Sequence, residues 1–461
     1  MNVATPTNLI QESAMISARI DRLPKWGISF PAKIVLILAY FFSFYDILSI
    51  GVTLPNVAGA FHLTGSEIAL PLTTSLAGYI LGSLSLGGLA DRVGRKTALM
   101  ISLLILAASS VACAFSWNLA SISIFRFIVG FGIGSQIALC ATLINELSPA
   151  HRRGANLQFN IFWAGVADAA TPFIILGFFN FTDMSIAWRL GLGFGVLALI
   201  PVVLMIWLPE SPRWLVTRGH GAKAEAIVKK MEDRLEQSGI KLPAVQPLAP
   251  AAAASTVSAK ILMQKPYLSR IVITLAFWIL FYVAVYGYLG FLTTLMDMMS
   301  SHMDSHVPHG VIYTAIGTLA LPVGAAAPLV LMDKVHRRIL LTVGSLIFVA
   351  GLVVMALSYS GLSLVVGSAI VAFSILFIAG VGYTYTAEIF PTAVRASAMG
   401  IADGGGHIGG VVAPYIVFAA LAAWGPRGAF GIMAVFMLAC ALLILILGVR
   451  NTDELKSKDF G

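Results

Sequence analysis

The chain has 461 residues, of which 58% are hydrophobic and only 11% are charged. Ordinary globular chains carry roughly a quarter charged residues, so this chain cannot cover itself with a water-compatible surface, and a soluble fold is excluded. The formal net charge of +8 would suit an acidic partner such as nucleic acid if it formed a patch, but the basic residues are spread in a different way.

Hydrophobic stretches of about 20 residues, the length at which a helix crosses ~30 Å of hydrocarbon, recur along the whole chain. Backbone groups in lipid must bond within their own segment, so these stretches are predicted to be helices. The predicted spans are 33–54, 67–89, 97–116, 119–143, 157–180, 187–208, 269–296, 310–332, 338–358, 362–386, 397–422 and 427–449. The predicted fold class is therefore an all-α integral membrane protein with twelve transmembrane helices.

The spans divide into two groups of six, separated by a polar stretch in which Lys223–Gln237 has the pattern of an amphipathic helix lying on the inner membrane face. The predicted parts are a cytoplasmic N-terminal tail at 1–32, a six-helix bundle at 33–208, a cytoplasmic linker at 209–268, a second six-helix bundle at 269–449 and a cytoplasmic tail at 450–461.

Lys and Arg gather in alternate connections between the predicted spans, and only Arg126, Arg189 and Arg427 lie elsewhere. By the positive-inside rule, this distribution places both termini in the cytoplasm and predicts a multi-pass protein of the cell (inner) membrane. The three cysteines lie inside predicted spans without metal-ligand spacing, and the histidines of 297–309 do not share a helical face. No metal or cofactor is expected.

A short acidic and basic pattern occurs twice, the second copy 242 positions after the first. Such internal repetition is typical of secondary transporters built from two related halves. Charged turns at the ends of adjacent helices can form ion pairs that break and re-form, so we predict a cytoplasmic gate here, although these residues can also simply anchor the helix ends. The predicted gate residues are Asp91, Arg95, Glu146 and Arg153, with their repeats Asp333, Arg337, Glu388 and Arg395.

Four motifs in a fixed order carry a resemblance to a known family: Gly87–Lys96, the glycine series from Arg126 to Gly134, Glu146–Gly154 and Pro209–Leu215. Through them the chain resembles the major facilitator superfamily over essentially its whole length, in the branch of sugar porters, organic-ion transporters and metabolite:proton symporters. The resemblance implies two pseudo-symmetric six-helix bundles and transport by alternating access. The expected partners are a small-molecule substrate, a proton and the lipid bilayer, and the chain is expected to work as a monomer.

Ionisable residues deep inside membrane spans are costly and usually functional. Counting ~1.5 Å per residue from the ends of their spans places Asp46 and Arg126 at the same depth, so the two could pair. The resemblance adds that proton-coupled sugar porters carry an Asp and an Arg at these motif positions, where the Asp carries the proton. We therefore predict a proton-coupling pair, with a permanent structural ion pair as the alternative.

A second set of polar residues is predicted to bind substrate. Asp403 and His407 are four residues apart on the eleventh span and so share a face, with three glycines between them that allow close approach of a ligand. Asp168 lies near the middle of the fifth span. Tyr286 and Tyr383 lie on the seventh and tenth spans, which line the cavity in the superfamily that this chain resembles.

The predicted substrate is a small charged or aromatic metabolite, with an organic acid favoured. A sugar site needs many neutral donors and acceptors, whereas the seventh span lacks the paired glutamines of sugar porters and Ile161 replaces another. A sugar porter and an organic cation transporter remain alternatives, as does a transport-dead membrane receptor from a different functional class. The sequence shows neither a catalytic constellation nor a phosphate-binding loop, so an enzyme is not expected.

Overall fold

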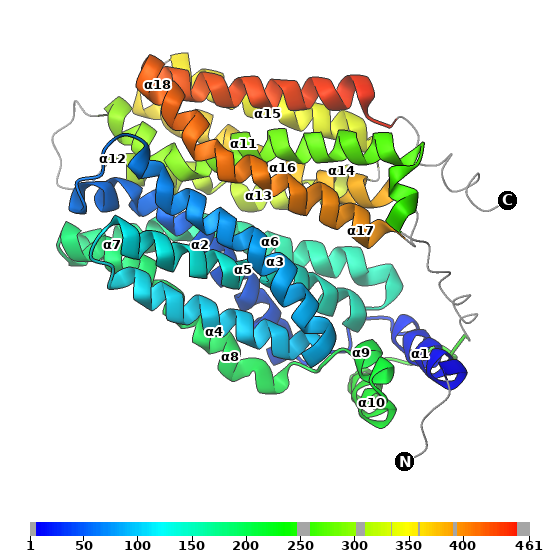
Figure 1. The fold of residues 1–461 in the computed structure, drawn as a ribbon. Helices are drawn as coiled ribbons and strands as arrows, with labels where there is room; N and C mark the ends of the chain where they lie inside the picture. The colour runs from blue at the N-terminus through cyan, green and yellow to red at the C-terminus, as the bar shows by residue number, and fades with distance from the viewer. Residues whose placement is uncertain are drawn as a thin grey trace.

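The computed structural model describes residues 6–246, 259–300, 309–332, 334–357, 360–390 and 394–449. Within these ranges the regular structure is helical and contains no strand, which confirms the predicted all-α class. Figure 1 shows that the helices run roughly parallel in two layers, with α2 to α8 in the lower layer and α11 to α18 in the upper one.

The lower layer contains six helical runs that match the first six predicted spans. Their starts follow local capping rules, because Ser29 accepts a hydrogen bond from the amide of Ala32 and Asn118 accepts one from Ser121. The helices are α2 (Phe30–Ala60), α3 (Leu70–Val93), α4 (Arg95–Ala114), α5 (Leu119–Leu147), α6 (Arg153–Phe181), and a sixth run made of α7 (Met184–Gly193), a short 3-10 turn and α8 (Leu199–Leu204).

The upper layer contains the remaining spans. They are α11 (Tyr267–Ser300), a run of α12 (His309–Thr318), α13 (Leu321–Ala326) and α14 (Pro328–Leu331), then α15 (Arg337–Leu357), α16 (Gly361–Glu388), α17 (Arg395–Met399), the π-helix η6 (Gly400–Gly404) and α18 (Gly405–Leu447). The described residues hold 11 helical runs long and apolar enough to cross a membrane. The long α18 bends sharply at Gly425, where φ is 68° and Pro426 follows, so its two limbs run in opposite directions and supply the eleventh and twelfth predicted spans.

Small residues bring neighbouring helices of one layer into backbone contact. A side-chain carbon at Gly130 or Gly134 on α5 would meet the backbone oxygen of Ser75 or Tyr79 on α3, so only glycine allows this approach. Close packing through small residues is how membrane helices associate when lipid is as apolar as their side chains. The approach predicted for the glycine series after Arg126 is therefore present.

Three short helices lie outside the two layers, at one end of the molecule (Figure 1): α1 (Pro6–Asp21), α9 (Pro212–Thr217) and α10 (Gly221–Gln237). The predicted amphipathic helix of the linker is α10. Its apolar side is occupied by protein, because its residues pack into one cluster with α1 and α9 rather than lying free for the membrane surface. The members of this cluster are Ile16, Ile20, Leu215, Val216, Ala224 and Val228.

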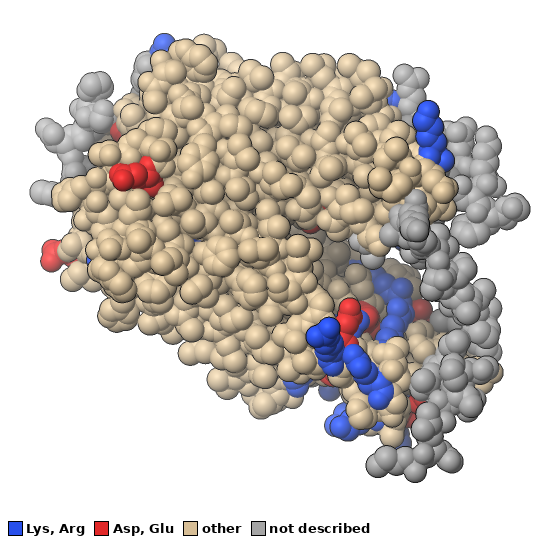
Figure 2. Space-filling model, viewed as in Figure 1, with Lys and Arg blue, Asp and Glu red and all other residues tan. Residues whose placement is uncertain are grey.

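Charged residues gather at that same end, which we call the basic end, and the rest of the visible surface is almost free of them (Figure 2). Figure 2 also shows a recess between the two layers at the basic end. In agreement, nothing lies within 4 Å of a side-chain carbon built at Gly87 of α3 or Gly404 of η6. Farther along the helices the layers touch, since Gly51 of α2 faces the backbone of Leu289 and Gly165 of α6 faces Pro322. The described structure is thus open at the basic end and closed beyond it.

Candidate functional site

The predicted pair of Asp46 and Arg126 is present between α2 and α5. Arg126 Nη1 lies 2.8 Å from Asp46 Oδ2, and the two residues are 1% and 2% exposed. Ser110 Oγ donates to Asp46 Oδ1 at 3.3 Å, and Arg126 Nε donates to Ser75 Oγ at 2.8 Å. A buried ion pair with satisfied neighbours tolerates the low dielectric, whereas removing one partner leaves a buried charge without compensation.

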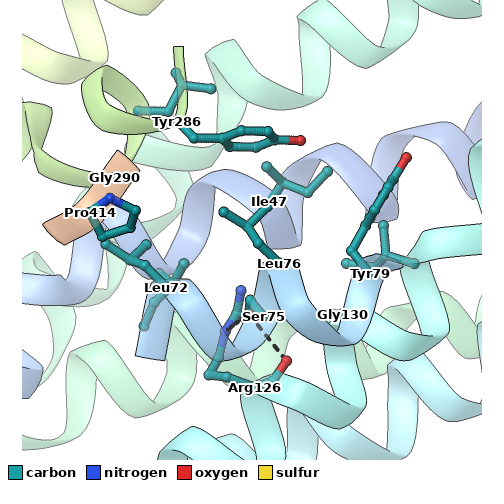
Figure 3. A pocket seen from close by; sticks show the side chains of 13 residues that line it. Ile47, Leu72, Ser75, Leu76, Tyr79, Arg126, Gly130, Tyr286, Gly290 and Pro414 are labelled. Carbon is teal, nitrogen blue, oxygen red and sulfur yellow. Dashed lines mark hydrogen bonds between the residues drawn. The ribbon is translucent and has the colours of Figure 1, made fainter. Parts of the chain in front are cut away.

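A cavity of about 40 Å³ lies against this pair, enough for about three water molecules. Arg126 forms part of its wall, while Asp46 lies behind Arg126 and is absent from the described lining. Figure 3 shows Arg126 on one side of the cavity and the rings of Tyr79 and Tyr286 across from it. The remaining lining residues are apolar or small, apart from Ser75: Ile47, Ile50, Leu72, Leu76, Gly130, Ile133, Leu289, Gly290 and Pro414.

A second polar cluster surrounds Asp403 of η6, just before α18 begins. Tyr282 Oη donates to Asp403 Oδ1 at 2.5 Å and Tyr383 Oη donates to the same oxygen at 3.2 Å. His407 Nδ1 lies 2.9 Å from the backbone oxygen of Asp403. Three of the predicted substrate residues therefore meet in one place, and Tyr282, one of the tyrosines of the predicted seventh span, is the closest partner of Asp403. The π-helical turn before His407 supports a functional reading, since such turns occur frequently at functional sites.

Aromatic rings connect the two clusters across the layers. His407 stacks on Tyr79 of α3, with ring centroids 4.5 Å apart and an interplanar angle of 17°. On the other side His407 contacts Tyr282, at 4.1 Å between centroids, and it lies 5.8 Å from Tyr286. Because α3 and α18 belong to different layers, this stack of Tyr79, His407 and Tyr282 is a bridge between them. Sequence reasoning missed Tyr79, which carries no charge and belongs to no motif.

Asp168 of α6 is buried, at 3% exposure, and its Oδ1 has no hydrogen-bond partner among the described residues. No described hydrogen bond or ion pair joins it to Asp403 or His407. Tyr286 links the two regions more loosely, since it lies close enough to feel the charges of both Asp168 and Asp403. The predicted substrate residues thus form one tight cluster and one separate carboxylate.

The predicted gate residues at the basic end form pairs within each layer. Arg95 lies 3.0 Å from Asp91 and 3.8 Å from Glu146, and Arg337 lies 3.1 Å from Glu388. No ion pair among the described residues joins the two layers at this end, as expected if the recess has separated them.

The remaining predicted gate residues have other surroundings. Arg153 does not pair with Glu146 in this structure, because Asp21 at the end of α1 takes it at 2.7 Å. Arg395 begins α17, and its Nε has no hydrogen-bond partner among the described residues. Asp333 lies outside the described residues.

The linker also contacts the turn that holds the predicted gate residues Asp91 and Arg95, which the sequence did not reveal. Glu210 accepts hydrogen bonds from the amide of Lys96 at 3.0 and 3.2 Å, so its carboxylate lies at the N-terminus of α4, where the helix dipole favours negative charge. Trp214 Nε1 and Arg218 Nη2 both donate to the backbone oxygen of Asp91. The motif Pro209–Leu215 was the only sequence signal for these contacts, and it did not indicate which residues Glu210 and Trp214 would contact.

Comparison with known proteins gives one result for the whole chain. The family model described as "Sugar (and other) transporter" matches residues 32–459. Among curated relatives, the niacin transporter NiaP of Acinetobacter baylyi is 29% identical over 445 residues, covering 95% of this chain and 98% of that protein. The inner membrane metabolite transport protein YdjE of Escherichia coli is 26% identical over 460 residues, covering 96% and 97%.

Among solved structures, the xylose transporter XylE of E. coli in a partially occluded inward-open conformation aligns with a TM-score of 0.75. The identity is 20%, and the alignment covers 90% of this chain and 97% of XylE. This likeness shows the fold, and the family match shows the membership. The family and the fold are those of transporters, not of enzymes. The chain belongs to the sugar (and other) transporter family of the major facilitator superfamily.

Proposed function

We propose that this protein is a proton-coupled symporter of a small organic acid, with an aromatic monocarboxylate as the favoured substrate. It works by alternating access as a monomer in the cell (inner) membrane. The observation that carries the proposal is the buried pair of Asp46 and Arg126 beside a cavity whose described wall holds a guanidinium and two tyrosines.

The proton-coupling role is assigned to Asp46 and Arg126. A carboxylate that accepts a proton loses its charge and its attraction for the guanidinium, so protonation frees the two helices α2 and α5 from a strong contact. Asp46 alternately takes up and releases the proton as the access of the site changes. The alternative of a permanent structural pair predicts that transport does not respond to the proton gradient.

The choice of an acid over a sugar rests on the polar groups of the two clusters. The cavity wall offers one cation, three hydroxyls and no side-chain amide among its described residues, whereas a sugar needs several neutral donors and acceptors. The likeness to a niacin transporter supports the proposal, because niacin is a planar heteroaromatic carboxylic acid. Asp403, His407, Tyr286 and Tyr383 are proposed to contact the substrate, and Asp168 to act from the neighbouring helix.

Orientation and gating complete the proposal. The basic end is assigned to the cytoplasm because membrane proteins keep Lys and Arg on that side. The gate consists of the two within-layer groups around Arg95 and Arg337, which meet when the recess closes. Residues 33–208 and 269–449 form the two bundles that rock against each other, and 209–268 is the cytoplasmic linker.

Uptake into proteoliposomes under an inside-alkaline gradient tests the proposal. The panel contains niacin, benzoate, xylose, inositol and an organic amine, each with and without a protonophore. We expect gradient-driven uptake of an aromatic acid that the protonophore abolishes.

Two other outcomes would replace the proposal. The family description and the XylE-like fold favour a sugar porter as the second candidate, and gradient-driven uptake of xylose or inositol without that of an acid would establish it. Binding of a ligand without any uptake would favour the receptor alternative.

A further inference from the structure

Arg126 is placed between two environments. Its Nη1 faces the buried Asp46, and its guanidinium is the one charged group in the cavity wall among the described residues. Asp46 contributes nothing to that wall. A ligand in the cavity therefore meets positive charge first, and the compensating carboxylate stands on the far side.

The hydrogen bonds of Arg126 leave one nitrogen of its guanidinium, Nη2, with only a weak partner. Nε donates to Ser75 and Nη1 to Asp46, while the described contact of Nη2 is a long one, 3.4 Å to the backbone oxygen of Asp46. Guanidinium groups bind carboxylates best through two parallel hydrogen bonds. The geometry therefore has capacity for a second carboxylate on the cavity side.

The energetics link that capacity to the proton. A guanidinium this deeply buried needs a counter-charge, and Asp46 is the carboxylate that the structure places on it. When Asp46 takes up a proton on its carboxylate, the guanidinium is left without a counter-charge. A carboxylate that enters the cavity at that moment restores the pairing, and it can take over Nη1 as well as Nη2.

We propose that Arg126 is the binding residue for the substrate carboxylate, and that substrate and proton are coupled because the substrate replaces Asp46 as the partner of Arg126. This inference rests on the proposed function. It makes the stoichiometry one proton for each carboxylate, and the total charge of the pair plus its ligands stays constant through the exchange.

The surroundings fix the direction of the ligand. Tyr79 and Tyr286 lie across the cavity from Arg126, and Arg126 is the one cation among the described lining residues. An aromatic acid is larger than the described cavity of about 40 Å³, so the layers must separate further to admit it, with its carboxylate toward Arg126 and its ring toward Tyr79 and Tyr286. Neither of these tyrosine hydroxyls has a hydrogen-bond partner in the described part of the chain, so both can serve a ring heteroatom.

The groups around Asp46 are few, which makes a clean test practical. Arg126 faces it from α5, Ser110 and Cys113 face it from α4, and Tyr45 interacts with it from its own helix. Asp46→Asn imitates the protonated carboxylate at every pH. Nicotinate and nicotinamide serve as probes, because they differ only in a carboxylate against a neutral amide.

The test is binding to the purified full-length protein by scintillation proximity, at mildly acidic and at alkaline pH. For the wild type, nicotinate affinity should fall as the pH rises through the range where Asp46 ionises, by up to about tenfold for each pH unit. In Asp46→Asn it should be high and independent of pH, at least about tenfold above the wild type at alkaline pH. Nicotinamide affinity should be the same for both proteins, which also shows that the variant is folded.

A double variant keeps the test decisive. Asp46→Asn with Arg126→Gln removes both charges, so it leaves no buried ion unpaired, and it should no longer prefer nicotinate over nicotinamide. Equal weakening of both probes in Asp46→Asn, or unchanged preference for nicotinate in the double variant, would overturn the inference while leaving proton symport intact. If the wild type binds neither nicotinate nor benzoate at acidic pH, the inference and the proposed aromatic-acid substrate are overturned together.

Discussion

The two halves of the protein place a hydrogen-bonded pair at the same position, and the pairs differ in charge. Asp46 and Arg126 form an ion pair of 2.8 Å in the first half. The residues 242 positions later are Tyr288 and Ser368, and their hydroxyls also lie 2.8 Å apart. The duplicated fold has kept the contact between the helices in both halves. Only the first half has kept groups that can bind and release a proton there.

At the basic end, by contrast, the two halves still repeat each other. Arg95 donates to the backbone oxygen of Ala90 and lies near Glu146. Arg337, 242 positions later, donates to the backbone oxygen of Met332 and pairs with Glu388, in the same register. The comparison teaches that the two halves repeat the same contacts at the basic end, and differ in chemistry where the ligands are proposed to bind.

The largest expected effect comes from breaking the charged pair rather than the neutral one. Asp46→Asn should reduce gradient-driven accumulation to background while exchange of substrate between the two sides persists, because the site can no longer release a proton. The matched variant Tyr288→Phe removes one neutral hydrogen bond of roughly 1 kcal/mol and should change uptake less than about fivefold. Proteoliposome uptake and counterflow measure both, and equal losses in the two variants would contradict the assignment of coupling to the first half.

Stability should show the same difference between the halves. Arg126→Gln leaves the buried Asp46 carboxylate unpaired and should cost about 3–5 kcal/mol of unfolding free energy. Ser368→Ala leaves the buried Tyr288 hydroxyl without its side-chain hydrogen-bond partner and should lower the free energy of unfolding by about 1–3 kcal/mol. Thermal unfolding in detergent compares them. Adding Asp46→Asn to Arg126→Gln should restore most of the loss, and failure to do so would show that the two side chains do not act as a pair.

Substitution of matched glycines should affect the halves alike. A side chain at Gly82 would meet the backbone of Phe131, and one at Gly324 would meet the backbone of Phe373, again 242 positions later. Gly82→Leu and Gly324→Leu should each cost about 1–3 kcal/mol through overpacking. Gly177→Ala serves as the control, because nothing lies within 4 Å of a side-chain carbon there. A large difference between the matched variants would mean that the packing is not equivalent.

The smallest effect concerns the basic end, where pH should act on the docking of α1 against α10 of the linker. Burial raises the pKa of Glu232, but hydrogen bonds from Arg19 and Arg22 outweigh it, so the pKa lies below the ordinary 4.5. The ion pairs that lower this pKa stabilise the docking of α1 when the pH is above the ordinary pKa of a glutamate. Their contribution is lost as the pH falls through the lowered pKa. The protection of amides 6–21, corrected for the pH dependence of intrinsic exchange, should then decrease, and Glu232→Gln should already lower it above the ordinary pKa.

The second half supplies the internal control for that measurement. There Arg338 donates to the backbone oxygens of Ile444 and Leu445, which do not titrate in this range. The protection of amides at the end of α18, corrected in the same way for intrinsic exchange, should therefore stay constant over the same acidic range. Parallel loosening of both regions would indicate general acid unfolding instead of the loss of α1.

The sequence was sufficient wherever the signal was local. Hydrophobic length predicted the spans, counting along two helices predicted the pairing of Asp46 with Arg126, and the spacing of Asp403 and His407 predicted their cluster. Contacts without a charge or motif signal, and charges with several possible partners, were beyond it. Tyr79 is one of many apolar or aromatic residues of a membrane helix until α18 places His407 on its ring. Arg153 carries the same charge in the sequence whether Glu146 or Asp21 takes it.

The contacts of the linker have a mechanical consequence. Glu210 fastens the stretch after the sixth crossing to the start of the third, Trp214 and Arg218 hold the turn at Asp91, and Asp21 ties α1 to Arg153. We expect these segments to move together as one rigid unit. The layers meet where α2 contacts α11, where α3 contacts α18 and where α6 contacts α12 and α13, so any rocking of the halves requires sliding at all of these contacts. The ring of His407 lies on Tyr79 where α3 meets α18.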